Sequence, residues 1–242
     1  MITPKEIEKK TMNPEKREKA KKDIFGFYVG RPITYILTVP FLYTNISPNI
    51  VSYISFIPII LGFILLAVGK TKMTLSLGWL GFFLWSMLDG VDGNIARYKK
   101  QYSKIGDTLD AAAGYFAMAL IFFGAGITAA HDMSGIVRNF VIVSGELYII
   151  LGGLSGMCMI IPRLIMHKAM TSTGSKDIGR MKDRAYYSFA KVIALNITSI
   201  PGLVQILLIV GIFTHTLDLY TIGYFFINIL IMLISLRSIF KG

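Results

Sequence analysis

The chain has 242 residues, of which 54% are hydrophobic, and a formal net charge of +11 at pH 7. Its mean hydropathy of +0.60 is typical of a protein with several membrane-spanning helices and excludes an ordinary soluble globular domain. The single cysteine, Cys158, lies in an apolar run, so we expect neither a disulfide framework nor a cysteine-based metal site.

Residues 1–30 form the first segment, and charged side chains dominate it. Residues 1–24 contain eight lysines and arginines mixed with several glutamates, and no apolar core of the kind found in a signal peptide follows them closely. We interpret residues 1–30 as a basic cytoplasmic tail that is partly helical. Such a tail is solvated or attracted to anionic lipid at the inner membrane surface, and the two states are compatible.

Residues 31–44 are apolar and aromatic, but they are too few to cross a membrane. A helix of this length covers about 20 Å, against about 30 Å of hydrocarbon. We therefore expect a juxtamembrane helix that lies in the membrane interface. Ser47, Pro48 and Asn49 then supply a helix start, with serine at the cap and proline in the first turn.

The rest of the chain contains long apolar segments separated by polar connections. The sequence predicts six membrane-spanning helices, at residues 49–69, 73–97, 106–130, 135–167, 187–212 and 217–238. The connections at 70–72, 131–134 and 213–216 are short, whereas those at 98–105 and 168–186 are longer and basic. Residues 31–242 are therefore expected to form one all-α integral membrane domain.

The orientation of the spans follows from the distribution of lysine and arginine. With the N-terminus in the cytoplasm, 22 of the 25 basic residues fall on the inner side, and only Lys70, Lys72 and Arg138 fall on the outer side. This bias follows the positive-inside rule and explains the basic composition without a nucleic-acid partner. Both termini are predicted to be cytoplasmic, and the cytoplasmic membrane is the expected location.

Aspartates interrupt the second and third predicted spans, where a carboxylate is costly and therefore marks a candidate functional site. Asp89 and Asp92 lie three residues apart in the second span, and Asp110 lies in the third. The eight residues 98–105 make these spans antiparallel neighbours, so their acidic faces can meet at similar depth. Oxygen ligands without histidine or cysteine indicate a hard cation, Mg²⁺ or Mn²⁺.

Small and basic residues accompany these aspartates. Gly93, Ala96 and Gly106 remove side chains where a bulky ligand could approach, and Arg97 offers a planar fork to phosphate oxygens. The pattern predicts a metal–diphosphate site at the inner membrane face. In the competing interpretation the aspartates pair with lysines or cap helices, which is disfavoured because three membrane carboxylates converge.

The stretch from Asp89 to Asp110 has the pattern D-x-x-D-G-x-x-A-R-x₈-G-x-x-x-D, which resembles the signature of the class I CDP-alcohol phosphatidyltransferase family. The six-span layout and the preceding juxtamembrane helix also resemble this family. The resemblance implies an integral membrane homodimer that cleaves a CDP-linked lipid or CDP-alcohol, releases CMP and joins the phosphoryl group to an alcohol. Such reactions belong to phospholipid or envelope-polymer synthesis.

The resemblance also assigns roles to residues. The three aspartates would be metal ligands, whereas the CDP moiety would be contacted or given room by five residues: Gly93, Ala96, Arg97, Ser103 and Gly106. The family pattern has a fourth aspartate four residues after Asp110, which would bind metal and act as the base on the acceptor hydroxyl. This chain has Gly114 at that position.

Gly114 leaves three interpretations open. In the first, another group replaces the base, and Asp107 is the nearest spare carboxylate. An acid at the start of a helix is, however, also explained by its favourable interaction with the helix dipole. Alternatively, the acceptor nucleophile is already ionised, so metal-assisted transfer needs no base. In the third interpretation, the protein binds a CDP-lipid without turning it over. Glu146, in the fourth predicted span, is a further carboxylate that we interpret as a buried polar tie.

The acceptor side is defined less sharply by the sequence. Arg163 is the best candidate for holding an acceptor phosphate, because it lies deepest among the basic residues near the inner end of the fourth span. An ion-coupled transporter is a further alternative function. It is disfavoured because the aspartates cluster at one membrane face and paired broken helices are not predicted.

Overall fold

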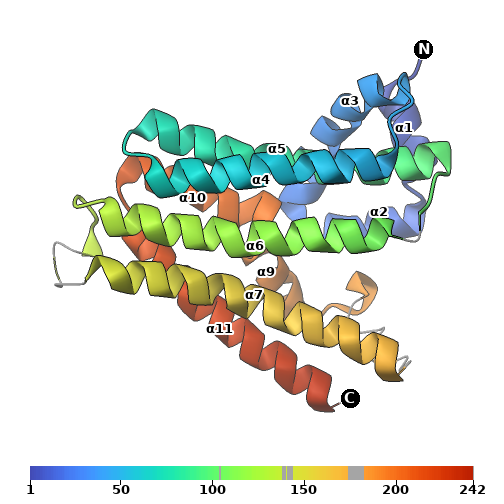
Figure 1. Cartoon of the computed structure of the whole chain (residues 1–242). Helices are drawn as coiled ribbons and strands as arrows, with labels where there is room; N and C mark the ends of the chain where they lie inside the picture. The colour runs from blue at the N-terminus through green and yellow to red at the C-terminus, as the bar shows by residue number, and fades with distance from the viewer. Residues whose placement is uncertain (104, 138–139, 141–143, 174–182, 242) are drawn as a thin grey trace.

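The computed structural model describes residues 1–103, 105–137, 140, 144–173 and 183–241 (Figure 1). These residues form helices and connections without a β-strand. Six helical segments are long and apolar enough to cross a membrane: α4 (Pro48–Val68), α5 (Lys72–Lys99), α6 (Gly106–His131), α7 (Gly145–Thr173), the segment Phe189–Thr214, and α11 (Leu217–Lys241). The predicted all-α membrane fold with six spans is therefore confirmed.

Both chain termini lie at the same end of this bundle (Figure 1). We call this the proximal end and the opposite one the distal end. The proximal end also holds the start of α4, the end of α5 and the start of α6 (Figure 1). An even number of spans requires this arrangement of the termini, and it brings the aspartate-bearing parts of α5 and α6 to one end.

Local capping signals set several helix boundaries. The Ser47 hydroxyl accepts a hydrogen bond from the Ile50 N–H at 3.4 Å, with Pro48 in the first turn, so α4 begins where the sequence predicts. The Thr71 side chain caps α5 in the same manner. Lys100 ends α5 in the left-handed conformation, with φ of 54°.

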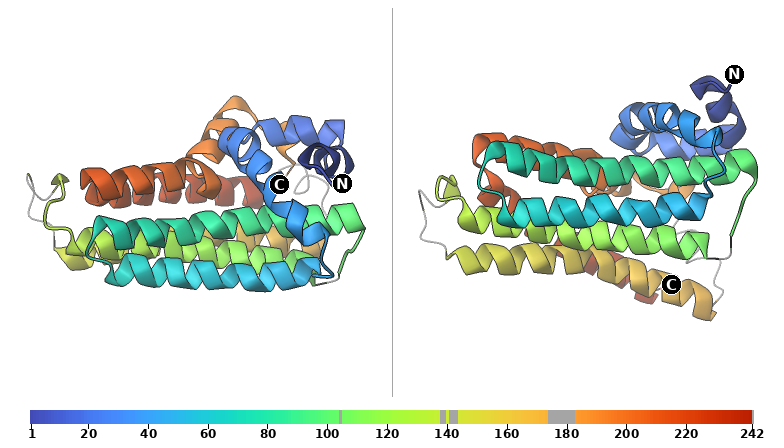
Figure 2. Two further views of the ribbon diagram at one scale, coloured as in Figure 1. Left: turned by 90° about the horizontal axis from the view of Figure 1, so that it is seen from above. Right: turned by 45° about the horizontal axis from the view of Figure 1, so that its top comes forward.

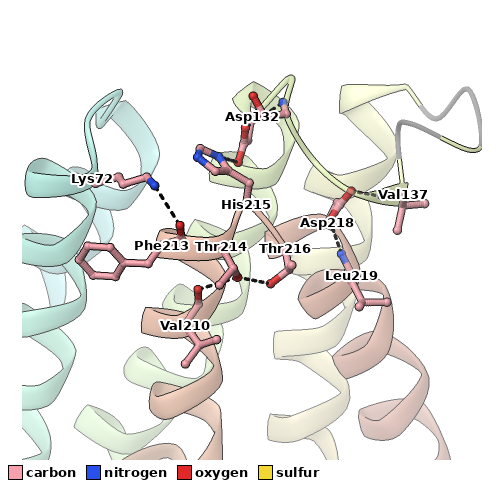
Figure 3. Close-up of polar contacts among 11 residues, drawn as sticks. Lys72, Asp132, Val137, Val210, Phe213, Thr214, His215, Thr216, Asp218 and Leu219 are labelled. Atoms are coloured by element: carbon pink, nitrogen blue, oxygen red, sulfur yellow. Dashed lines mark hydrogen bonds and ion pairs between the residues drawn. The ribbon is translucent and has the colours of Figure 1, made fainter.

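The fourth span begins later than predicted, at Gly145 instead of residue 135. The connection before it is tied to the start of α11, because the Val137 N–H donates to the Asp218 carboxylate at 2.6 Å (Figure 3). Hydropathy alone cannot reveal such a tertiary contact. Glu146 consequently lies in the first turn of α7 and is exposed, so the predicted buried polar tie is wrong.

Polar contacts join the connections between the helices at the distal end (Figure 3). The His215 Nδ1 lies 2.9 Å from a carboxylate oxygen of Asp132, which joins the end of α6 to the turn before α11. The Lys72 ammonium donates to the Phe213 carbonyl at 2.9 Å. These contacts link the turns at the end that lies opposite the aspartates.

The fifth span is broken, whereas the sequence predicts one helix over 187–212. Helix α9 (Phe189–Ile197) is followed by the π-helical stretch η4 (Ile200–Val204) and then by α10 (Gln205–Thr214). Gly202 has non-helical dihedral angles, with φ of −107° and ψ of −123°. The preceding proline, at position 201, has no N–H to donate, which favours an interruption here.

The N-terminal residues fold against the proximal end. They form α1 (Pro4–Thr11), α2 (Pro14–Lys21), η1 (Gly26–Gly30) and α3 (Arg31–Leu42), and Figure 2 shows these elements on the same side of the bundle as α9. Ile7 of α1 is fully buried. Residues 1–30 are thus helical as predicted, but they pack on the bundle and differ in this respect from a solvated tail.

Helix α3 takes the position predicted for the juxtamembrane helix and also packs against α5. The Asn94 side-chain amide of α5 donates to the Thr38 hydroxyl of α3 at 3.1 Å, and both groups are buried. A Cβ on Gly90 would collide with the Thr34 side chain, so this glycine permits the close approach of the two helices. The contact places the start of α3 beside the aspartate-bearing part of α5.

Close packing of α6 on α7 also depends on glycine, which leads to a stability prediction. A Cβ on Gly152 would lie 2.5 Å from the Phe122 carbonyl oxygen, so Gly152→Ala forces the helices apart. We expect a loss of about 1–3 kcal/mol, measured as thermal unfolding in detergent. Gly223→Ala is the matched control, because nothing lies within 4 Å of its Cβ position. Equal stability of the two variants would contradict this account of the packing.

Candidate functional site

A cavity of about 530 Å³ lies at the proximal end of the bundle. Its lining comes from α2, η1, α3, α4, α5, α6, the connection between α5 and α6, Arg184 of η3 (Arg184–Tyr186) and Pro201 of η4. It contains the three predicted metal ligands and all five residues assigned to the CDP moiety: Asp89, Asp92, Asp110, Gly93, Ala96, Arg97, Ser103 and Gly106. The structure therefore brings these predicted residues together, although their roles remain predictions.

The three aspartates form the acidic side of the cavity. Asp92 is only 7% exposed, and its carboxylate accepts a hydrogen bond from the Ser52 hydroxyl of α4 at 2.5 Å. The Asp89 carboxyl group lies next to that of Asp110 and near that of Asp92. Helix α5 thus supplies two carboxylates, α6 supplies the third, and α4 orients one of them.

The donor set fits a hard divalent cation that takes only part of its coordination from protein. Carboxylate and hydroxyl oxygens face one cavity, and such oxygens are the ligands that Mg²⁺ and Mn²⁺ prefer. Within the described ranges, no group of three or more His, Cys, Asp or Glu residues forms a preassembled metal cage. A cation here would need oxygen atoms from a ligand or from water as well.

Basic side chains also line this cavity, and we call the aspartates its acidic side and these cations its basic side. Lys16 of α2, Arg31 of α3 and Arg97 of α5 all line it. Arg97 donates to the Asn94 side-chain oxygen at 3.2 Å, while its Nε is buried without a hydrogen-bond partner. Among the described residues, no ion pair within 4.0 Å joins any of these three cations to an aspartate of the acidic side.

Gly93 has a specific packing role beside Arg97. A Cβ on Gly93 would lie 2.9 Å from the Arg97 Nη2 and 3.0 Å from its Nη1. The glycine therefore lets the guanidinium lie flat against α5, between the aspartates and the loop that follows. The sequence predicts room for a ligand at this position, whereas in the structure the Arg97 guanidinium group occupies the space beside Gly93.

Ser103 and Gly106 line the cavity together with Asn49, which the sequence indicated only as part of a helix start. The Ser103 hydroxyl donates to the Asn49 side-chain oxygen at 2.9 Å, and both side chains line the cavity. A Cβ on Gly106 would lie 3.1 Å from the Ser103 hydroxyl. Asn49 is thus a candidate ligand contact. The sequence did not indicate this role, because Asn49 directly follows Ser47-Pro48 and was interpreted only as part of a helix start.

The position of the missing fourth aspartate is open. The nearest atom to a Cβ built on Gly114 is the Met118 Cε, at 3.9 Å. Arg163 does not line the aspartate cavity; it donates to the Met118 sulfur at 3.0 Å and to the Met159 carbonyl at 2.8 Å. The candidate acceptor residue therefore lies behind Met118, on the side of α6 that faces α7.

Asp107 connects the aspartate cavity with a second one of about 550 Å³ between α6 and α7. It is exposed, lies in the first turn of α6 and lines both cavities. The second cavity is also lined by Tyr115 and His167, whose hydroxyl and Nδ1 are 2.9 Å apart. The sequence named His167 only as one of several basic residues at the inner end of the fourth span, and its pairing with Tyr115 was not predicted, because the spacing of the two residues carries no motif.

The ammonium group of Lys16 is held in an unfavourable environment. Burial, followed by the positive charges of Arg97 and Arg31, lowers its pKa from the ordinary 10.5 to about 8. Between these pH values the unfolded chain binds more protons than the folded one. The contribution of Lys16 to the stability of the folded protein should therefore become less unfavourable as the pH rises from about 8 to 10.5.

Lys16→Met tests this conclusion, because it keeps the side-chain length and removes the charge. We expect the ligand-free variant to be more stable than the wild type at pH 7, by roughly 1 kcal/mol after allowance for solvent screening. The difference should narrow as the pH rises above about 8. Thermal unfolding in detergent measures both effects. Lys21→Met serves as the control, since Lys21 pairs with Glu18 at 2.6 Å; lower stability of Lys16→Met at pH 7 would refute the prediction.

Comparison with known proteins identifies the family. Residues 45–234 match the model of the CDP-alcohol phosphatidyltransferase family, and no match was found among curated proteins. The matched residues cover well over half of the chain and include the whole acidic motif, but they leave α1, α2 and α3 outside. On the strength of this match, which agrees with the resemblance of the acidic motif, the chain belongs to the CDP-alcohol phosphatidyltransferase family.

Proposed function

We propose that the protein transfers a phosphatidyl or phospho-alcohol group from a CDP-linked donor to an acceptor and releases CMP, with a divalent cation bound at the aspartates. Membership of the family supports a membrane transferase that uses CDP-alcohol donors. The observation that carries the proposal is that one cavity is lined both by three aspartates and by cations that form no ion pair with them among the described residues. A metal ion would complement the aspartates, and a diphosphate would complement the cations.

Asp89, Asp92 and Asp110 would hold the cation, which when bound neutralises charge on the diphosphate and on the departing CMP. The Ser52 hydroxyl fixes the orientation of the Asp92 carboxylate. Arg97, with its partnerless Nε, presents donors to phosphate oxygens. Asn49 and Ser103 supply the polar groups nearest to the connection between α5 and α6, where they can hydrogen-bond the nucleotide.

In the proposed reaction, the acceptor oxygen forms a bond to the phosphorus that carries the alcohol. The bond between that phosphorus and the oxygen bridging to CMP breaks, and CMP leaves with the electron pair. The acceptor proton needs a base when the acceptor is a hydroxyl. Asp107 is a carboxylate in the first turn of α6, and it lines both cavities. Because position 114 has no aspartate, Asp107 is the candidate base.

The proposal also covers the setting of the reaction. The positive-inside bias supports a cytoplasmic site in the cytoplasmic membrane, with both termini on that side. Family membership supports a homodimer and a role in phospholipid or envelope-polymer synthesis. Arg163, which contacts Met118 beside the open Gly114 position, is the proposed contact for an acceptor phosphate.

The metal requirement gives the first test. Titration of CDP by calorimetry should show binding with Mg²⁺ and little binding with EDTA, because three carboxylates repel a diphosphate unless a cation separates them. Asp89→Asn and Asp110→Asn should each abolish the Mg²⁺-dependent part. Asp107→Asn, at the same cavity but in the first turn of α6, should keep most of it. Equal CDP affinity in Mg²⁺ and EDTA would exclude the metal-bridged site.

Gly114→Asp tests the chemical step. The added carboxylate has open space, lies one turn beyond Asp110 on the same face of α6 and can act as a base. With hydroxyl acceptors, we expect faster CMP release, by up to about 10²–10⁴-fold. Gly114→Asn is the matched control, because it has the same shape and no basic oxygen.

The acceptors for this assay are inositol, glycerol phosphate and a phosphate-only acceptor. A slower rate for Gly114→Asp than for the wild type would indicate an acceptor that is already ionised, which the new charge repels. No CMP from any variant with any acceptor, despite intact CDP binding, would favour the non-catalytic CDP-lipid-binding alternative.

A further inference from the structure

The N-terminal helices supply part of the cavity wall although they lie outside the residues that match the family. Helix α2 contributes Lys16 and Ala20, and the segment that follows contributes Asp23 and Arg31. The family match begins only at residue 45. The wall formed by α2 is therefore a property of this chain that the acidic motif does not predict.

Helix α2 is held over the cavity by contacts with the segment before α9 and with α9 itself. The Lys19 ammonium pairs with the Asp183 carboxylate at 2.9 Å. The Lys22 ammonium donates to the Arg184 carbonyl at 2.7 Å, and the Asn196 side chain donates to the Lys22 carbonyl at 2.7 Å. These contacts place α2 firmly, so the position of Lys16 does not depend on a loose terminus.

Among the residues that the structure describes, Lys16 differs from the other basic residues of α2 in having no acidic partner. Lys19 pairs with Glu15 and Asp183, and Lys21 pairs with Glu18. Within the described part of the chain, the Lys16 ammonium makes a single hydrogen bond, a long one of 3.5 Å to a backbone carbonyl in α1. Its closest charged surroundings are the guanidinium groups of Arg97 and Arg31, which repel it.

A half-buried ammonium beside two guanidinium groups costs stability unless an anion joins them. The aspartates on the acidic side do not serve as this anion, because no described ion pair within 4.0 Å connects the two sides. A phosphate group between the two sides would satisfy Lys16 together with Arg97, while its other oxygens face the aspartates and their cation.

We infer that Lys16 binds a phosphate group of the CDP-linked donor, so that α2 forms part of the substrate site. This inference rests on the proposed function and adds to it a substrate-binding residue from outside the family-matched region. A half-buried lysine that has no acidic partner among the described residues, and that costs stability, is typical of a residue retained for binding.

The experiment compares Lys16→Gln, Lys16→Arg and the control Lys21→Gln with the wild type. CDP, CMP, cytidine and glycerol phosphate are titrated separately by calorimetry at pH 7 with Mg²⁺. We expect Lys16→Gln to weaken CDP binding by about tenfold and to leave cytidine binding unchanged. Lys16→Arg should retain most of the CDP affinity, and Lys21→Gln should match the wild type. Thermal unfolding of each variant checks that it is folded.

Three results would overturn the inference. If Lys16→Gln binds CDP as tightly as the wild type does, Lys16 has no role in binding while the proposed function stands. If Lys16→Gln weakens only glycerol phosphate, the lysine serves the acceptor and not the donor. If the wild type itself fails to bind CDP with Mg²⁺, the proposed function fails, and this inference fails with it.

Discussion

The separation of opposite charges across one cavity is the constraint on which the proximal end depends. Asp89, Asp92 and Asp110 occupy one side, and Lys16 and Arg97 occupy the other. Buried charges normally find partners, because an unpaired charge in a poorly solvated site is costly. Here, within the described part of the chain, the Ser52 hydroxyl orients Asp92, and no ion pair within 4.0 Å joins the three aspartates to the two cations. A ligand that carries both phosphate and metal removes this cost, so the free protein is prepared for that ligand.

The positions of most spans could be predicted, because most of their boundaries depend on local chemistry. Apolar length defines the helices, and Ser47-Pro48 defines the start of α4. The start of α7 and the break near Gly202 were missed for the same reason: each depends on partners far away in the sequence. Asp218 ties the connection before α7, and Ser199, just before the break, donates to Asp23 at 3.3 Å.

The acidic motif was accessible from sequence because carboxylates are rare in membrane helices and their spacing indicates a shared face. Lys16 was not accessible, because it is one of many lysines in a charged segment and only the fold shows that it lines the cavity without an acidic partner among the described residues. Asn49 was hidden by a plausible role in helix capping. The Tyr115–His167 pair depends on the contact of α6 with α7, which no local pattern indicates.

The break in the fifth span has a mechanical consequence. Its Gly202 lies against Phe25, and Asn196 of α9 holds both the Lys22 carbonyl and the Ile24 N–H. Helix α2 and the residues that follow it are thus joined to the broken fifth span at several points. A displacement of α2 would therefore be transmitted to α9, where the break at Gly202 can absorb part of it, and also to α5, since the Tyr98 hydroxyl donates to Glu6 of α1.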